Sequence, residues 1–150
     1  MIQDVIFRKY SFSDKHDVLK IFDLNSPEYF GLNEREYFIE YLDNLPGEYF
    51  VIENNGIIIG CGGITEKKGN NEVHLSWGML NPEFHRKGIG KRFAEFRINR
   101  IKENFPGVIC VVETTQKSCG FFEKLGFKLI YTKIDHFAPG LDLYRMEMYL

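Results

Sequence analysis

The sequence has few cysteines, few prolines and almost no net charge, and each shortage excludes a class of protein. Its 150 residues contain three cysteines, Cys61, Cys110 and Cys119, too few and too irregularly spaced for a disulfide framework or a zinc site. They predict packed, reduced thiols and a cytoplasmic location. Five prolines with 44% hydrophobic and 27% charged residues exclude disordered, collagen-like and coiled-coil chains. A net charge of −2 gives no field that would gather nucleic acid.

Long apolar segments are also missing. The longest apolar run, Ile57–Ile64, is interrupted by three glycines and is far short of a membrane span. Met1–Tyr10 mixes charged with apolar residues and has no apolar core of the kind found in export signals. A chain of this length buries roughly 68–70% of the surface it exposes when unfolded. We therefore expect one soluble, cytoplasmic domain over residues 1–150, with no membrane partner.

Hydrophobic periodicity and turn residues predict the order β-α-α-β-β-β-α-β-α-β-β. The helices are expected from Ser13 as N-cap, from Asn33 with Glu36 completing a capping-box spacing, over Gly88–Asn104 and over about Ser118–Leu125. An antiparallel half that leads into one strand–helix–strand crossover predicts an α/β (α+β) fold: a central mixed, partly antiparallel sheet with helices on both faces. The seven strands are expected at Asp4–Tyr10, Tyr49–Glu53, Ile57–Ile64, Val73–Leu80, Val108–Thr114, Phe127–Asp135 and Leu143–Leu150.

One segment between a strand and a helix is suited to binding an anion. Gly88 and Gly90 open a helix, whose first N–H groups have no internal partner and lie at the positive end of its dipole. The glycines let the backbone approach a diphosphate, and Arg86, Lys87 and Lys91 add positive charge. The spacing fits neither a Rossmann nor a P-loop motif. Taken alone, the pattern also fits tight helix–strand packing with solvated basic residues.

The segment from His85 to Gly90, His-Arg-Lys-Gly-Ile-Gly, resembles the pyrophosphate motif of the GNAT superfamily of acyl-CoA-dependent N-acetyltransferases, Gln/Arg-x-x-Gly-x-Gly/Ala. His85 stands where Gln or Arg is usual. Phe121–Phe127, Phe-Phe-Glu-Lys-Leu-Gly-Phe, resembles a second motif of the superfamily. One helix and one strand separate the two motifs, as in the superfamily, and the element order matches over essentially the whole chain. The resemblance implies a GNAT domain that uses acetyl-CoA as co-substrate and needs no metal.

The resemblance also implies where acetyl-CoA binds. The strand Glu72–Leu80 is expected to bulge and to splay from its parallel neighbour Val108–Thr114, so that the pantetheine arm lies between them. Backbone N–H groups would then hold and polarise the thioester carbonyl. The expected cofactor-binding residues are Gly78, Met79, Leu80, His85, Arg86, Lys87, Gly88, Ile89, Gly90, Lys91, Thr115 and Phe122.

Transfer to an amine also requires removal of a proton, because an amine with a pKa of about 10.4 is almost entirely protonated at pH 7. In some branches of the superfamily a Glu on the bulged strand serves as the base, and His74 occupies that position, with Glu72 and Ser76 on the same strand face. Histidine suits the role chemically. Glu113, at the end of the neighbouring strand, is a second candidate. A pocket-lining or surface histidine is the equally weighted alternative for His74.

Two departures from the superfamily bear on the mechanism. Phe122 stands where many members have a tyrosine that protonates the departing thiolate, and Thr115 stands where an Asn is frequent. The thiolate would leave unassisted, since a thiol pKa near 8.5 makes it a fair leaving group, or would use Cys119, Tyr131 or water.

Three functions are therefore compared. The leading one is an N-acetyltransferase acting on a primary amine of a small molecule or peptide; the alternative, supported by Phe122, is a non-catalytic acyl-CoA-binding module. A nucleic-acid binder would rest on basic residues spread around one helix and the turn before it, and the acidic whole argues against it. These residues are Arg86, Lys87, Lys91, Arg92, Arg97, Arg100 and Lys102. Dimers are frequent in the superfamily, so a homodimer is compatible with the sequence. Rings expected near the acceptor are Tyr29, Phe30, Tyr37, Tyr41, His136, Phe137 and Tyr144.

Overall fold

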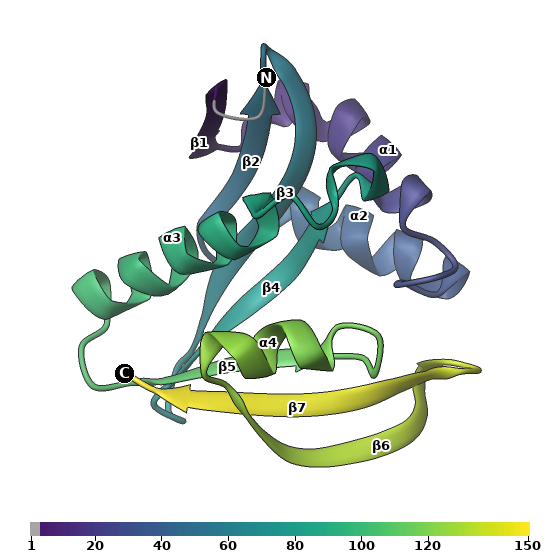
Figure 1. The fold of residues 1–150 in the computed structure, drawn as a ribbon. Coiled ribbons are helices and arrows are strands. Elements are labelled where there is room, and N and C mark those ends of the chain that lie inside the picture. Colours follow the sequence, from purple (N-terminus) through teal and green to yellow (C-terminus); the bar gives the residue numbers. More distant parts are fainter. Residues whose placement is uncertain (1–3) are drawn as a thin grey trace.

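The computed structural model describes residues 4–150, which form one seven-stranded sheet flanked by four α-helices (Figure 1). Met1–Gln3, the start of the segment searched for an export signal, lie outside the described residues. The predicted order of strands and helices and the mixed sheet with helices on both faces are confirmed. The strands are β1 (Val5–Lys9), β2 (Tyr49–Asn54), β3 (Ile57–Lys67), β4 (Glu72–Leu80), β5 (Ile109–Thr114), β6 (Lys128–Ala138) and β7 (Leu141–Tyr149). The helices are α1 (Lys15–Leu24), α2 (Arg35–Asp43), α3 (Ile89–Asn104) and α4 (Cys119–Leu125).

The sheet order is β1-β2-β3-β4-β5-β7-β6, and β4 and β5 are its one parallel pair. Their pairing runs only from Glu72 opposite Ile109 to Leu75 opposite Val112. Beyond that point the two strands diverge, so that the sheet opens into two arms (Figure 1). The splay implied by the sequence is confirmed.

A bulge in β4 lies where the strands diverge. Ser76 faces Gly63 and Met79 faces Cys61 on β3, so two β4 residues lie between those pairs against one β3 residue. One of the two, Trp77, has φ +45, which is rare for a residue with a side chain. The expected bulge is therefore present in β4.

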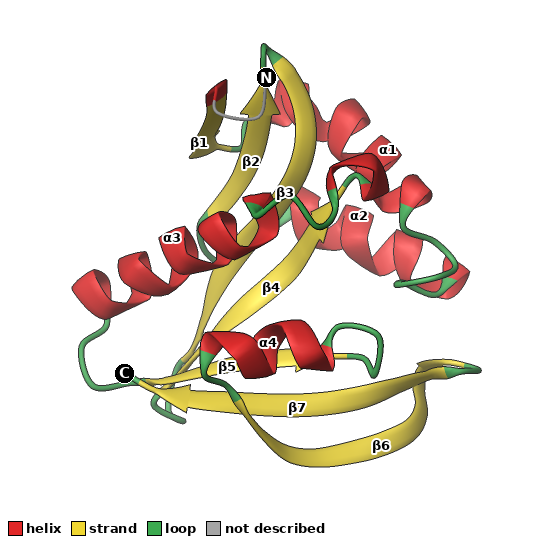
Figure 2. Ribbon diagram, in the orientation of Figure 1, coloured by secondary structure: helices red, strands yellow, loops and turns green. Residues whose placement is uncertain are grey.

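Each face of the sheet carries its own core. Helices α1 and α2 cover one face, and α3 and α4 cover the other (Figure 2). The first core is built from Val18, Phe22, Phe38, Val51 and Cys61, among others. The second includes Phe50, Val73, Ile89, Phe93, Ile101 and Cys110. The three cysteines are buried and unpaired, as their spacing predicted.

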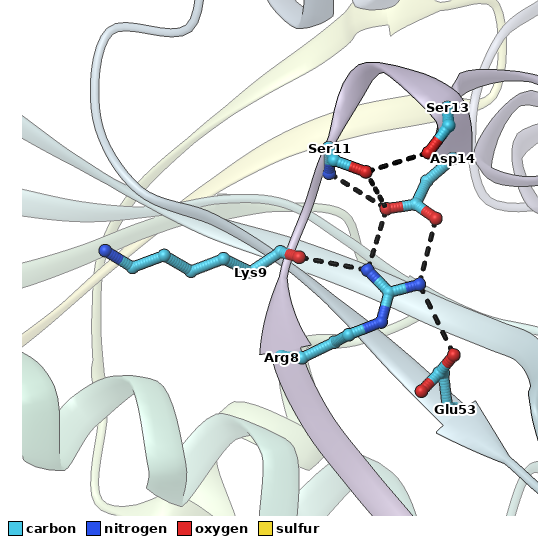
Figure 3. Close-up of polar contacts among 6 residues, drawn as sticks. All are labelled: Arg8, Lys9, Ser11, Ser13, Asp14 and Glu53. Carbon is cyan, nitrogen blue, oxygen red and sulfur yellow. Dashed lines mark hydrogen bonds and ion pairs between the residues drawn. The ribbon is translucent and has the colours of Figure 1, made fainter.

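Each of the two N-terminal helical segments begins earlier than predicted, because a short 3-10 turn, Phe12–Asp14 or Leu32–Glu34, precedes the α-helix proper. Ser11, not Ser13, starts the first: its N–H donates to Asp14 Oδ2 at 2.8 Å, and Arg8 holds the same carboxylate through Nη1 at 2.8 Å (Figure 3). Gly31 starts the second, and its N–H donates to Glu34 Oε2 at 2.8 Å. The predicted partner Glu36 is exposed.

Two hairpins are longer than predicted. β3 runs to Lys67 instead of Ile64, and the β6–β7 hairpin continues to a tight turn at Gly140. Backbone N–H of Gly140 donates to Asp135 Oδ1 at 2.8 Å, a side-chain bond that sustains the hairpin beyond the expected end of its first strand. Within residues 4–150 no helix has the length and apolar character needed to cross a bilayer.

Candidate active site

The unpaired end of β4 offers backbone donors on its β5 side. Asn81 N–H donates to Ile59 O on β3 at 2.7 Å, and Met79 pairs with Cys61. Because successive residues of a strand hydrogen-bond to opposite sides, the N–H group of Leu80 points away from β3, toward the side that β5 has left. Gly78 lies in the bulge and, within residues 4–150, is paired with neither β3 nor β5. Of the three predicted amides, that of Leu80 therefore faces the gap in pairing, that of Met79 faces β3, and that of Gly78 belongs to the unpaired bulge.

A basic turn follows directly and leads into α3. Arg86 and Gly88 both adopt positive φ, +62 and +82, which turns the chain sharply before the helix begins at Ile89. Ile89 is buried and anchors the helix start, whereas Arg86, Lys87 and Lys91 are exposed, and none of these three takes part in an ion pair within residues 4–150. Free basic groups around open helical N–H groups fit a diphosphate.

His85 lies differently from the rest of this turn. Its Nε2 lies 3.2 Å from the carbonyl oxygen of Leu80, and its ring meets the edge of Tyr29 in the α1–α2 connection at 5.6 Å between centroids. His85 therefore ties the turn to the end of β4 and to the neighbouring loop. Its predicted contact with the cofactor stays a prediction.

Helix α4 faces the start of α3. A Cβ on Gly90 would lie 3.6 Å from the Phe121 ring, an ordinary contact. Phe122 packs between Phe121 and Phe127, at 5.0 and 5.6 Å between ring centroids. Thr115 is buried, and its Oγ1 accepts the Lys117 N–H at 3.2 Å, so its hydroxyl caps the turn before α4.

The two candidate bases lie on the opposite face of β4 and β5, joined through an ion-pair network. His74 is 8% exposed, and its Nε2 lies 3.0 Å from Glu72 Oε1. Arg145 on β7 donates to Glu72 Oε2 at 2.8 Å and to Glu147 Oε2 at 3.0 Å. Its Nη1 lies 4.0 Å from Glu113 Oε2. His74 and Glu113 thus share a face without touching.

Glu72 sets the tautomer of His74. Burial would raise the pKa of Glu72, but hydrogen bonds from His74 and Arg145 outweigh it and leave that pKa lowered. An ionised carboxylate only accepts, so the proton of a neutral His74 ring lies on Nε2 and Nδ1 keeps its lone pair. The geometry fits a base that is oriented by a carboxylate.

A chain of hydroxyl groups lies between His74 and the bulge. Ser76 Oγ is 2.9 Å from Thr65 Oγ1 and 3.3 Å from Tyr41 Oη. Tyr49 Oη donates to the carbonyl oxygen of Trp77 inside the bulge at 2.8 Å. Sequence reasoning missed Thr65 and Tyr49; the one signal for Thr65 was a polar residue at the end of an apolar strand.

Segments far apart in the sequence meet beside this face. Asn33 Nδ2 donates to Phe137 O at 3.2 Å, which joins the α1–α2 connection to the β6–β7 hairpin. Of the rings expected near the acceptor, Phe30 stacks on Trp77 at 5.8 Å between centroids, whereas Tyr37 is exposed. The ring-rich wall is therefore partly a packing feature.

The basic face of α3 is smaller than the sequence indicated. Arg97 is buried at 5% exposure, and Arg100 is bound to Glu48 through two hydrogen bonds of 3.0 and 2.6 Å. A surface for nucleic acid loses both residues. Residues 4–150 also contain no group of three His, Cys, Asp or Glu side chains placed to hold a metal ion.

Comparison with known proteins agrees with this geometry. The family model described as "Acetyltransferase (GNAT) family" matches residues 18–127. No curated protein is similar enough in sequence to count as a match.

Solved structures with the same fold act on different acceptors. The ribosomal-protein-S18-alanine N-acetyltransferase from Escherichia coli has a TM-score of 0.79 at 15% identity, covering 97% of this chain and 93% of that chain. An aminoglycoside 6'-N-acetyltransferase complexed with coenzyme A has a TM-score of 0.76 at 15% identity, covering 96% of both chains. A GNAT acetyltransferase from Elizabethkingia anophelis with acetyl-CoA bound has a TM-score of 0.75 at 18% identity, covering 98% and 99%. The family match over most of the chain and these shared folds lead to one conclusion: the chain belongs to the GNAT family of acetyltransferases.

Proposed function

We propose that this protein transfers the acetyl group of acetyl-CoA to a primary amine of a small molecule or peptide. The observation that carries the proposal is that two groups of donors follow one another along the chain. The β4 amides of Gly78 and Leu80, which have no partner in β5, lead within one turn to the exposed basic residues at the start of α3. Relatives of the same fold are described with coenzyme A or acetyl-CoA bound.

In this proposal the turn and the strand bind the two ends of acetyl-CoA. The N–H groups at the start of α3, with Arg86, Lys87 and Lys91, neutralise the pyrophosphate. His85, Gly88, Ile89 and Gly90 shape the turn. Thr115 and Phe122 border the thiol end from α4 and its preceding loop.

The amide of Gly78 holds the thioester oxygen. As the acceptor nitrogen bonds to the acetyl carbon, the carbonyl electron pair moves to that oxygen, and a fixed donor there is worth about 10²–10³ in rate. The carbon–sulfur bond then breaks and sulfur leaves with its electron pair. The amide N–H remains in place throughout, so no reorganisation is required.

His74 takes the proton that the acceptor nitrogen loses. Nδ1 carries the lone pair because Glu72 holds the proton on Nε2. Glu113 is the second candidate base, and Arg145 Nη1 lies 4.0 Å from its Oε2. A base is needed because few amine molecules are neutral at pH 7.

The second candidate function is a non-catalytic acyl-CoA-binding module. Phe122 favours it, because this side chain is packed among rings and has no proton to give the thiolate. The proposed enzyme releases the thiolate to solvent, consistent with an ordinary thiol pKa of about 8.5. Both functions use the same cofactor edge; only the first uses His74.

The experiment that separates them follows the acyl group. Protein and [¹³C]acetyl-CoA are incubated with amines, amino acids, polyamines, arylalkylamines and peptides, and both free thiol and acetylated product are measured. The enzyme predicts thiol release with one acceptor class, matched by product mass. Saturable acetyl-CoA binding without product for any class would favour the binding module. A cytoplasmic location and a homodimer stay parts of the proposal that this experiment leaves aside.

A further inference from the structure

Arg97 is a buried arginine beside the β4 bulge, and it forms no ion pair with a carboxylate of residues 4–150. It lies in α3 at 5% exposure, and its Nε has no hydrogen-bond partner within residues 4–150. Its Nη1 donates to Gly63 O over a long 3.3 Å, and its guanidinium lies 4.7 Å from the centre of the Phe93 ring. By contrast, Arg8, Arg35, Arg100 and Arg145 all bind carboxylates.

Burying a charge in this way is costly unless something negative compensates it. The cation–π contact with Phe93 and one long hydrogen bond stabilise the buried charge much less than a carboxylate partner would. Burial lowers the pKa of Arg97 to about 10, so the guanidinium still carries its charge at neutral pH. The protein therefore maintains an uncompensated positive charge at this point of the sheet.

Two glycines make room for the guanidinium, and one of them is Gly78. A Cβ on Gly62 would lie 2.9 Å from Arg97 Cζ, and a Cβ on Gly78 would lie 2.9 Å from Nη2. The charge therefore lies against the α3-facing side of Gly78, the residue whose amide is proposed to hold the thioester oxygen.

We propose that Arg97 is a positioning residue for the thioester: its buried charge lies beside Gly78, on the α3 face of β4, and stabilises the negative charge that develops on the carbonyl oxygen. The inference rests on the proposed function and deepens it. Arg97 makes no bond to the substrate and exchanges no proton. Its contribution is electrostatic and acts through a low-dielectric interior, where a fixed charge is most effective.

The titratable groups around Arg97 leave its field constant near neutral pH. They are Tyr41 on α2, Tyr49 on β2, Cys61 on β3 and Cys110 on β5. Burial raises the pKa of both thiols to about 12 and also raises the pKa of both tyrosines. None of the four gains a charge between pH 7 and pH 9.

The test measures the carbonyl stretch of bound [1-¹³C]acetyl-CoA by infrared difference spectroscopy, without acceptor, in the wild type, Arg97→Met, Arg97→Lys and the control Arg100→Met. A polarised carbonyl absorbs at lower frequency than free acetyl-CoA. We expect Arg97→Met to return the band toward the free value and to lower kcat about 10- to 100-fold, less than the loss of a direct donor. The dissociation constant for coenzyme A should change less than about twofold, and Arg100→Met should match the wild type.

Arg97→Lys provides a readout that a purely structural arginine would not move. A buried lysine loses its proton at lower pH than an arginine. The band of Arg97→Lys is expected to shift with pH between 7 and 9 while that of the wild type stays fixed, and this comparison holds even if Arg97→Met does not fold.

Three results would overturn the inference. One is an unchanged carbonyl band in a folded Arg97→Met; another is a band in Arg97→Lys that does not depend on pH. The third is faster turnover of a carboxylate-bearing acyl-CoA, such as succinyl-CoA, than of acetyl-CoA, because Arg97 would then pair with the acyl group itself. Failure of the wild type to bind acetyl-CoA would instead refute the proposed function.

Discussion

The two sides of β4 differ in the kind of chemical group that each presents. On the side that β5 leaves, the site consists of backbone amides, glycines and exposed basic residues at the start of α3. On the face proposed to meet the acceptor, it consists of partly or fully buried side chains, with His74, Glu72 and Arg145 joined by hydrogen bonds of 2.8 to 3.0 Å. A backbone site depends little on the identity of side chains, whereas a site built from side chains changes when those residues change.

The contrast extends to how each side is supported. The proposed cofactor side depends on glycine conformations and on one helix, and its basic residues Arg86, Lys87 and Lys91 form no ion pair within residues 4–150. The acceptor side depends on contacts between distant segments, including Asn33 with Phe137 and Arg145 with Glu72. Variants on the first side should therefore change cofactor binding, and variants on the second should change turnover.

The largest expected effect is on the acceptor side. Replacing His74 with Gln should lower kcat by about 10²–10⁴-fold, the usual contribution of a general base, with the KM for acetyl-CoA unchanged. The measurement is kcat and the KM for acetyl-CoA of both proteins, with His16→Gln as a control at an exposed histidine of α1. An unchanged kcat in a folded His74→Gln would contradict the role of His74.

The next effect is on the cofactor side. Gly90→Ala should weaken coenzyme A binding about tenfold, ~1.4 kcal/mol, because a methyl group blocks the close approach of a diphosphate. The added Cβ meets Phe121 only at 3.6 Å, so the fold should be unharmed and the helix favoured. Titration calorimetry measures the dissociation constant of coenzyme A, and thermal unfolding without ligand measures the stability of the fold.

Gly88→Ala is the matched comparison for that variant. Gly88 has φ +82, where a Cβ costs about 1–2 kcal/mol, so this variant should lower the free energy of unfolding even without ligand. Equal destabilisation by both substitutions would show that Gly90 serves packing and not cofactor binding.

A smaller effect concerns the Arg8–Asp14 network at the start of the first helical segment (Figure 3). The hydrogen bond from Arg8 lowers the pKa of Asp14 to about 2, from an ordinary value of 3.8. A lowered pKa stabilises the fold above the ordinary value, and this stabilisation is lost as pH falls from about 4 through 2. Asp14→Asn should cost about 1–2 kcal/mol at pH 7 and flatten the acid limb of stability against pH.

The control for Asp14 is the exposed pair of Lys15 and Asp43, at 2.7 Å. Asp43→Asn should change the free energy of unfolding by less than about 1 kcal/mol, because solvent screens an exposed pair. Urea unfolding at pH 7 and pH 3 compares the two variants, and equal costs would show that the Arg8 network stabilises no more than a surface pair.

The smallest effect is expected at Phe122 in α4. Phe122→Tyr adds a hydroxyl that could protonate the thiolate, and we expect less than about a fivefold rise in kcat because the thiolate already leaves readily. Steady-state kinetics with the preferred acceptor measure it. A rise of 100-fold would show that the missing acid limits turnover and would strengthen the binding-module alternative for the natural protein.

The sequence predicted the cofactor side better than the acceptor side, for a physical reason. Gly88 and the residues around it are local in sequence, so spacing alone defines the turn and the helix start. The order of elements and the splayed strand pair followed from periodicity and the family motifs. Arg97 was misjudged as one of several basic residues on a helix, because its burial depends on glycines 35 and 19 residues away, Gly62 and Gly78.

The acceptor face shows the same limit. That His74 would be tied to Arg145 through Glu72 depends on β7 lying next to β5, which no local pattern reports. The 3-10 turns that precede α1 and α2 were not predicted, because such short turns have weak sequence signals. Contacts between residues far apart in the sequence could not be predicted from local patterns.

The most direct test of a two-sided site is a steady-state comparison of His74→Gln with Gly90→Ala, using one acceptor and varied acetyl-CoA. We predict that the two variants change different kinetic parameters. His74→Gln lowers kcat with the KM for acetyl-CoA unchanged, whereas Gly90→Ala raises that KM with kcat unchanged. If both substitutions change the same parameter, or if neither changes acceptor-dependent thiol release, the division of the site along β4 is wrong.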